Sequence, residues 1–98
     1  MIYEDYIRVK KKYAESQKEY ESALDRQKEV LKTKTTMQEW EWLLSKKREE
    51  LAESFEIDDR VYYLRFVKKM KIKQIVKEIS YSEAQIYRII ANIRKAGT

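Results

Sequence analysis

The side chains best suited to chemistry lie together on one predicted helix near the C-terminus, residues 83–95. The side of this helix that faces away from its isoleucines carries only polar or small residues, namely Ala84, Gln85, Arg88, Ala91, Asn92 and Lys95. Small residues permit close approach to another surface, while arginine and glutamine or asparagine can form paired hydrogen bonds with the edges of guanine and adenine. The pattern is compatible with recognition of base edges in a DNA major groove and with an ordinary solvated helix surface, and the lysines of the preceding helix favour the first.

Catalysis is not expected, because the sequence lacks two residue types that many enzymes use, cysteine and histidine. The sequence contains no cysteine and no histidine, which removes thiol nucleophiles, imidazole bases and nearly all zinc sites. Carboxylates are numerous, but they alternate with lysines at helical spacing, which is typical of a solvated helix surface. We therefore expect a protein that is not an enzyme, with no catalytic residue, no metal site and no cofactor.

Positive charge is concentrated in the C-terminal part of the chain. Residues 1–57 contain 12 basic and 13 acidic residues, whereas residues 58–98 contain ten basic and four acidic ones. A localised positive surface is the electrostatic pattern expected for a partner with a phosphate backbone. The lysines predicted to contact that backbone are Lys69, Lys71, Lys73, Lys77 and Lys95.

Two short helices are predicted to position these side chains. Apolar residues at helical spacing mark the first helix, at Ile72, Ile75, Val76 and Ile79. Ser80 and Tyr81 form the turn, and Ser82 with Gln85 has the form of a capping box at the start of the second helix. The isoleucines of the second helix cluster on one side and predict its buried face, at Ile86, Ile89, Ile90 and Ile93.

Residues 61–95 resemble region 4 of sigma-70-type factors, and the stretch YSEAQIYRI, residues 81–89, is similar to small phage regulators of the RinA and ArpU kind. The shared pattern is a bulky residue and a serine at the turn, then charged or small residues, then an aliphatic anchor, here Ile86. Family members often carry glycine in the turn, where this chain has Ser80. The resemblance covers no residue before Val61.

This resemblance implies a helix-turn-helix regulator of phage or prophage origin that binds promoter DNA, with a contact to RNA polymerase left open. Carried over position by position, the groove-facing residues are Ser82, Glu83, Gln85, Tyr87, Arg88 and Asn92. Arg88 and Gln85 are the best candidates for reading bases. Glu83 would either accept a hydrogen bond from a cytosine amino group or only favour the helix N-terminus.

The N-terminal part of the chain is predicted to form two long helices in an antiparallel hairpin. In the first helix Tyr6, Tyr13 and Tyr20 share one heptad position, and the apolar positions continue to Leu31. Such a stripe is compatible with a coiled coil between two copies and with packing inside one chain.

A threonine-rich stretch, residues 33–36, is predicted to end the first helix. Thr36 and Glu39 have the form of a capping box for a second helix that begins near Met37. The apolar residues of this second helix are Met37, Trp40, Leu43, Leu44, Leu51 and Phe55. Among them Trp40 is expected to be buried.

A third helix is expected to follow, with Asp58 or Asp59 as its cap. It carries apolar residues on nearly every side, namely Val61, Tyr62, Tyr63, Leu64, Phe66 and Val67. This distribution predicts a central position in a tyrosine-rich core. The sequence thus predicts an all-α fold, with a helical hairpin for packing or oligomerisation in residues 1–57 and a three-helix, helix-turn-helix DNA-binding domain in residues 58–98.

The function that these features favour is sequence-specific binding of double-stranded DNA by a transcriptional regulator. Two other classes remain open: a phage small terminase subunit, which joins a helix-turn-helix to oligomerising helices, and a helical adaptor protein. A homodimer through the N-terminal helices is compatible with the tyrosine stripe. No apolar run approaches the ~20 residues of a transmembrane helix, and the first residues lack the basic start of a signal peptide. We therefore expect a cytoplasmic protein with no membrane partner.

Overall fold

The computed structural model describes residues 1–97, and this part of the chain is helical throughout, with no strand. In chain order its elements are α1 (Ile2–Arg26), α2 (Val30–Glu53), α3 (Ile57–Tyr62), the π-helical turn η1 (Tyr63–Val67), α4 (Ile72–Ile79) and α5 (Glu83–Lys95). The prediction of an all-α fold is confirmed. None of the helices in this range is both long enough and apolar enough to cross a membrane.

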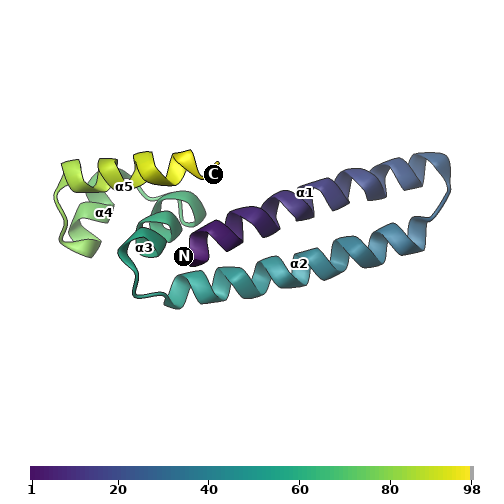
Figure 1. The fold of residues 1–98 in the computed structure, drawn as a ribbon, viewed down its shortest axis with the longest axis horizontal. Helices are drawn as coiled ribbons and strands as arrows, with labels where there is room; N and C mark the ends of the chain where they lie inside the picture. The colour runs from purple at the N-terminus through teal and green to yellow at the C-terminus, as the bar shows by residue number, and fades with distance from the viewer. Residues whose placement is uncertain (98) are drawn as a thin grey trace.

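Helices α1 and α2 lie side by side and antiparallel, and they form the long arm of a molecule that extends 53 Å (Figure 1). Helix α1 buries Tyr6, Val9, Ser16 and Ala23, of which the last two are small. The hydroxyl of Ser16 donates to the backbone carbonyl of Tyr13 at 2.7 Å, so its polar atom is satisfied. The apolar stripe predicted on the first helix therefore packs mainly against other parts of the same chain.

The turn of this arm differs from the prediction. The first helix ends at Arg26, and Gln27 and Glu29 adopt left-handed conformations with φ of 52° and 58°. The threonine-rich stretch lies inside α2, where the hydroxyls of Thr35 and Thr36 donate to the carbonyls four residues earlier. These bonds let threonine remain in a helix, and no capping box forms between Thr36 and Glu39.

Three apolar residues expected to face the core are more exposed than predicted. Leu31 lies in the first turn of α2 instead of ending the first helix, and 78% of it is exposed. Phe55 lies beyond the end of α2, and 98% of it is exposed. Trp40 packs against the core but is only partly buried. Leu31 and Phe55 both lie beyond the end of the helix to which their spacing assigns them, because an apolar side chain alone does not reveal where a helix ends.

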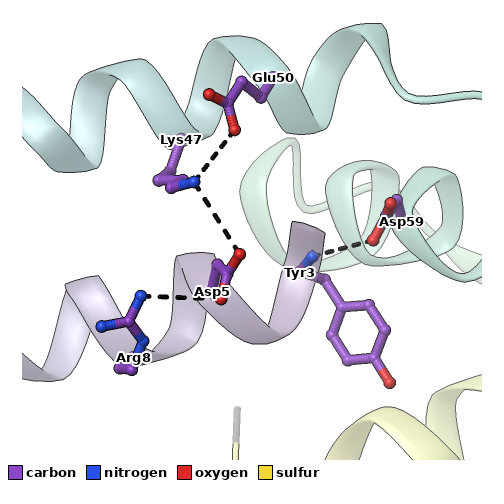
Figure 2. A network of polar contacts seen from close by, with 6 residues as sticks. All are labelled: Tyr3, Asp5, Arg8, Lys47, Glu50 and Asp59. Carbon is purple, nitrogen blue, oxygen red and sulfur yellow. Dashed lines mark hydrogen bonds and ion pairs between the residues drawn. The ribbon is translucent and has the colours of Figure 1, made fainter. Parts of the chain in front are cut away.

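One ion pair, between Lys47 and Asp5, joins the two long helices near their open end (Figure 2). The ammonium group of Lys47 lies 3.3 Å from the carboxylate of Glu50 and 3.9 Å from that of Asp5, which also pairs with Arg8 at 3.7 Å. Exposed pairs of this kind contribute about 0–1 kcal/mol each. The packing of the two helices therefore owes little to these pairs.

A fully buried carboxylate ties the start of α1 to α3. One oxygen of Asp59 accepts from the backbone N–H of Tyr3 at 2.9 Å (Figure 2). The other oxygen accepts from the hydroxyl of Ser54 at 2.7 Å. The expectation that Asp58 or Asp59 caps the third helix is wrong, because α3 begins at Ile57 with Glu56 before it and has no side-chain cap. Asp59 instead satisfies a free N–H in the first turn of α1.

The centre of the core is Tyr62, which is 1% exposed. Its ring stacks on Tyr3 and Phe66 and meets Tyr6 edge-on, with centroid distances of 5.8, 5.1 and 5.7 Å. Burial first, and then the neighbouring Tyr6, raises the pKa of Tyr62 to about 12. Burial also raises the pKa of Tyr3, with smaller contributions from nearby carboxylates.

The third helix passes directly into the π-helical turn η1. The backbone N–H of Lys68 donates to the carbonyl of Tyr63 at 2.9 Å, five residues earlier. Residues of α1, α3, α4 and α5 share one apolar cluster around this segment. The predicted boundary between two domains, at residues 57 and 58, stays a prediction. Because both parts contribute to one core, tests of function should use the intact chain.

Candidate nucleic-acid interface

The segment before α4 is held by backbone contacts. The N–H of Met70 donates to the carbonyl of Leu64, and the guanidinium of Arg65 donates to the carbonyl of Met70, both at 2.9 Å. Helix α4 begins after Lys71, whose N–H donates to the side-chain oxygen of Gln74 at 3.1 Å. These bonds fix the path of a lysine-rich loop relative to η1.

Helix α4 is short and has two distinct sides. Ile75 and Ile79 are buried, as the apolar period predicted. Lys73 and Lys77 are exposed and lie four residues apart, which places them on the same face of the helix. Two ammonium groups therefore point outward from one side of α4.

The turn between α4 and α5 spans residues 80–82. Ser80 adopts the left-handed conformation, with φ of 63°, and its N–H donates to the carbonyl of Val76. This conformation is the one that glycine adopts without steric cost. Serine occupies it here because the buried helices on both sides determine the direction of the chain.

The predicted capping box at the start of α5 is confirmed. The hydroxyl of Ser82 accepts from the N–H of Gln85 at 3.2 Å, and the side-chain oxygen of Gln85 accepts from the N–H of Ser82 at 2.9 Å. Ser82 and Gln85, which were both expected to face DNA, thus make hydrogen bonds with the backbone. Gln85 would keep its amide nitrogen free as a donor, but its oxygen is already in use.

Helix α5 divides cleanly into a buried and an exposed side. Ile86, Ile90 and Ile93 are at most 4% exposed, and Ile89 is partly buried. An exposed row follows on the opposite side at spacings of three and four residues, namely Gln85, Arg88, Asn92 and Lys95. Ala84 and Ala91, one turn before and one turn after Arg88, are also exposed, so small residues flank Arg88 along the helix. The surface that α5 presents is polar and has small residues on both sides of Arg88.

The remaining predicted groove residues lie at the edges of this surface. Glu83 is exposed in the first turn of α5, and Tyr87 is 54% exposed. The predicted phosphate-contacting lysines, Lys69, Lys71, Lys73, Lys77 and Lys95, are all exposed. The structure therefore brings the predicted residues to one part of the molecule, on α5, on α4 and on the loop before α4.

The positive charge of this region is not neutralised by ion pairs. Within residues 1–97, the ion pairs all join residues of α1 and α2, and none involves a basic residue after position 57. The ammonium of Lys68 lies 5.8 Å from the centre of the Tyr63 ring, a contact that leaves its charge in place. The basic side chains on α4 and α5 are thus free to bind anionic groups.

Two further basic residues near this surface, Arg94 and Lys11, were not among the predicted DNA contacts. Arg94 is exposed in the last turn of α5. The ammonium of Lys11, on α1, lies beside Gly97, 2.9 Å from the position that a Cβ would occupy there. The position of Lys11 could not be predicted from the sequence, because only the tertiary fold brings α1 close to the end of α5.

The described part of the chain holds no candidate metal centre. Residues 1–97 contain no group of three carboxylates close enough together to hold a metal ion. Comparisons with protein-family models, with curated proteins and with solved structures find no match to this chain.

Proposed function

We propose that the chain is a sequence-specific, double-stranded DNA-binding transcriptional regulator that reads the major groove with α5. The observation that carries this proposal is the exposed polar row of α5, which stands opposite a largely buried isoleucine face. A helix that is anchored by one side and is polar and exposed on the other matches the requirements of a recognition helix.

In this proposal α4, the turn and α5 act as the helix-turn-helix that the resemblance to sigma region 4 implies. Arg88 would read a base edge, since its guanidinium has no partner in the described structure and small residues flank it. Asn92, one turn further, becomes the second reader, because Gln85 is engaged in the capping box. Phage origin and a contact with RNA polymerase remain parts of the proposal that rest on the resemblance alone.

The lysines of α4 would contact phosphates and fix the orientation of α5. Lys73 and Lys77 are exposed, share a face and make no ion pair within residues 1–97. Each phosphate that is neutralised adds a slope of about −0.9 to the dependence of log K on log salt. Their contribution should therefore be visible as a change in salt dependence for every DNA sequence.

The proposal is tested by titrating the intact chain onto labelled duplex DNA at several salt concentrations. Affinity should fall steeply with salt, and Lys73→Ala with Lys77→Ala should reduce the slope by about one unit per lysine. The matched control is Lys18→Ala with Arg26→Ala, which removes the same charge from exposed positions on α1. Failure to bind duplex DNA at low salt, or equal effects of the two pairs of substitutions, would contradict the proposal.

A further inference from the structure

The outer side of α2 exposes an apolar strip that no other element of the described chain covers. Leu31 is 78% exposed and Trp42 is 63% exposed. They lie eleven residues apart, which is close to three helical turns, so both point to the same side. Helix α2 packs on α1 and α3 with its other sides and forms one long edge of the molecule (Figure 1).

A shallow hollow lies on this strip, next to the exposed tryptophan. It is lined by Thr35, Gln38, Glu39, Trp42 and Leu43. A tryptophan indole is the largest exposed apolar group on the strip, and a second indole would find an apolar wall in Trp42 and Leu43. The strip thus holds both a projecting side chain and a place to receive one.

The charges along α2 run in the direction opposite to the one that its helix dipole favours. On the side that carries the strip, Lys28 and Lys32 stand near its start and Glu49 and Glu53 stand near its end. Lys46, Lys47 and Arg48 also lie near this end, where Lys46 pairs with Glu49 and Lys47 with Glu50. Helix dipoles favour acids at the start and bases at the end. Within residues 1–97, Lys28, Lys32 and Glu53 take part in no ion pair. A second, antiparallel copy of α2 would bring Lys28 against Glu53 and Lys32 against Glu49.

We infer that this strip binds a second copy of the chain, with the two α2 helices antiparallel about a two-fold axis. The axis would pass between residues 40 and 41, which places Trp42 of each copy in the hollow beside Glu39 of the other. In the same register Lys28 of one copy faces Glu53 of the other, Lys32 faces Glu49, and Leu31 lies opposite Glu50. Symmetry repeats each contact, as in other self-complementary interfaces.

This inference does not depend on DNA binding, and it changes the expected place of a dimer contact. The sequence suggested pairing through the tyrosine stripe of the first helix, but Tyr6 is buried inside the chain. A contact through one helix per copy is smaller than the roughly 800 Å² per partner of a standard interface, so we expect association in the micromolar range.

Sedimentation equilibrium over the micromolar range tests the dimer with the intact protein. The unmodified chain should be a dimer at high concentration, and Trp42→Ala should weaken the dimer by roughly 100-fold, because buried tryptophans dominate interfaces of this kind. The matched control is Phe55→Ala, since Phe55 is an even more exposed aromatic away from the strip. It should leave the dimer unchanged, and circular dichroism should show all variants folded.

Charge reversal tests the register. Lys28→Glu should weaken the dimer by roughly tenfold through two repelling pairs, and adding Glu53→Lys should restore it. A cysteine crosslink gives a second check, because the natural chain contains no cysteine. Glu39→Cys should yield a covalent dimer with a short bifunctional maleimide, whereas Gln17→Cys on α1 should not. A concentration-independent monomer, a ring of more than two copies, or a dimer indifferent to Trp42→Ala would overturn the inference.

Discussion

Replacing Asp59 by alanine should destabilise the protein more than any other change of a single carboxylate in the first turn of α3. Asp59 is fully buried and accepts hydrogen bonds from the N–H of Tyr3 and the hydroxyl of Ser54. These contacts join α1, the loop after α2 and α3. The substitution therefore acts on the junction between the hairpin and the C-terminal part.

The magnitude follows from the two bonds. Loss of a side-chain cap costs about 0.5–2 kcal/mol, and loss of a hydrogen bond to a charged group costs about 1.5–3 kcal/mol. Because the two losses share one carboxylate, they do not add fully, and we expect Asp59→Ala to lower the free energy of unfolding by about 2–4 kcal/mol. Asp59→Asn should cost about half as much, since the amide oxygen can still accept from Tyr3.

Urea denaturation followed by circular dichroism measures these free energies. The matched control is Asp58→Ala, because Asp58 lies in the same turn, is partly exposed and makes no hydrogen bond or ion pair within residues 1–97. It should cost less than about 1 kcal/mol, as expected for a carboxylate near a helix N-terminus. Equal midpoints for Asp58→Ala and Asp59→Ala would refute the role assigned to Asp59.

Three further predictions concern the core, the turn and the arm. The pKa of Tyr62 is raised from 10.0 to about 12, so the folded state keeps a proton that the unfolded chain releases, and stability present below pH 10 should be lost as the pH rises through 12. Tyr62→Phe should reduce this alkaline loss, measured as the difference between urea midpoints at pH 8 and pH 11; an unchanged difference would argue against it. Ser80→Gly should stabilise the protein by roughly 0.5–1 kcal/mol, because glycine adopts the left-handed conformation freely, and a lower melting temperature would contradict this. Trp40→Ala should cost about 1.5–3 kcal/mol, less than for a fully buried tryptophan, and a larger loss in urea would mean that Trp40 is buried.

The C-terminal helices could be predicted from the sequence because their signals are local. The capping box joins residues three apart, Ser82 and Gln85, and the isoleucines of α5 repeat within four residues of each other. A single helix thus carries its start, its buried face and its exposed face in its own sequence. The predicted base-reading residues lie on α5 or at its start, so the candidate site could be predicted from the same local pattern.

The hairpin turn and the Asp59 contact could not be predicted in this way. The turn contains neither glycine nor proline, and Gln27 and Glu29 give no sign of their left-handed conformations. Asp59 and Tyr3 lie 56 residues apart, so a local pattern could place Asp59 only as a cap of its own helix. Gln85 was predicted both as a cap and as a base reader, and the structure shows the first of these roles.

The affinity of Arg88→Ala for a preferred and for a random duplex tests the central claim most directly. The preferred sequence is first selected from a random DNA pool with the unmodified chain. The substitution should then cost about 1–3 kcal/mol on the preferred duplex, leave binding to random DNA nearly unchanged and remove the preference at one base pair. Equal losses on both duplexes would mean that Arg88 contacts only phosphate, which would contradict base reading by Arg88 on α5.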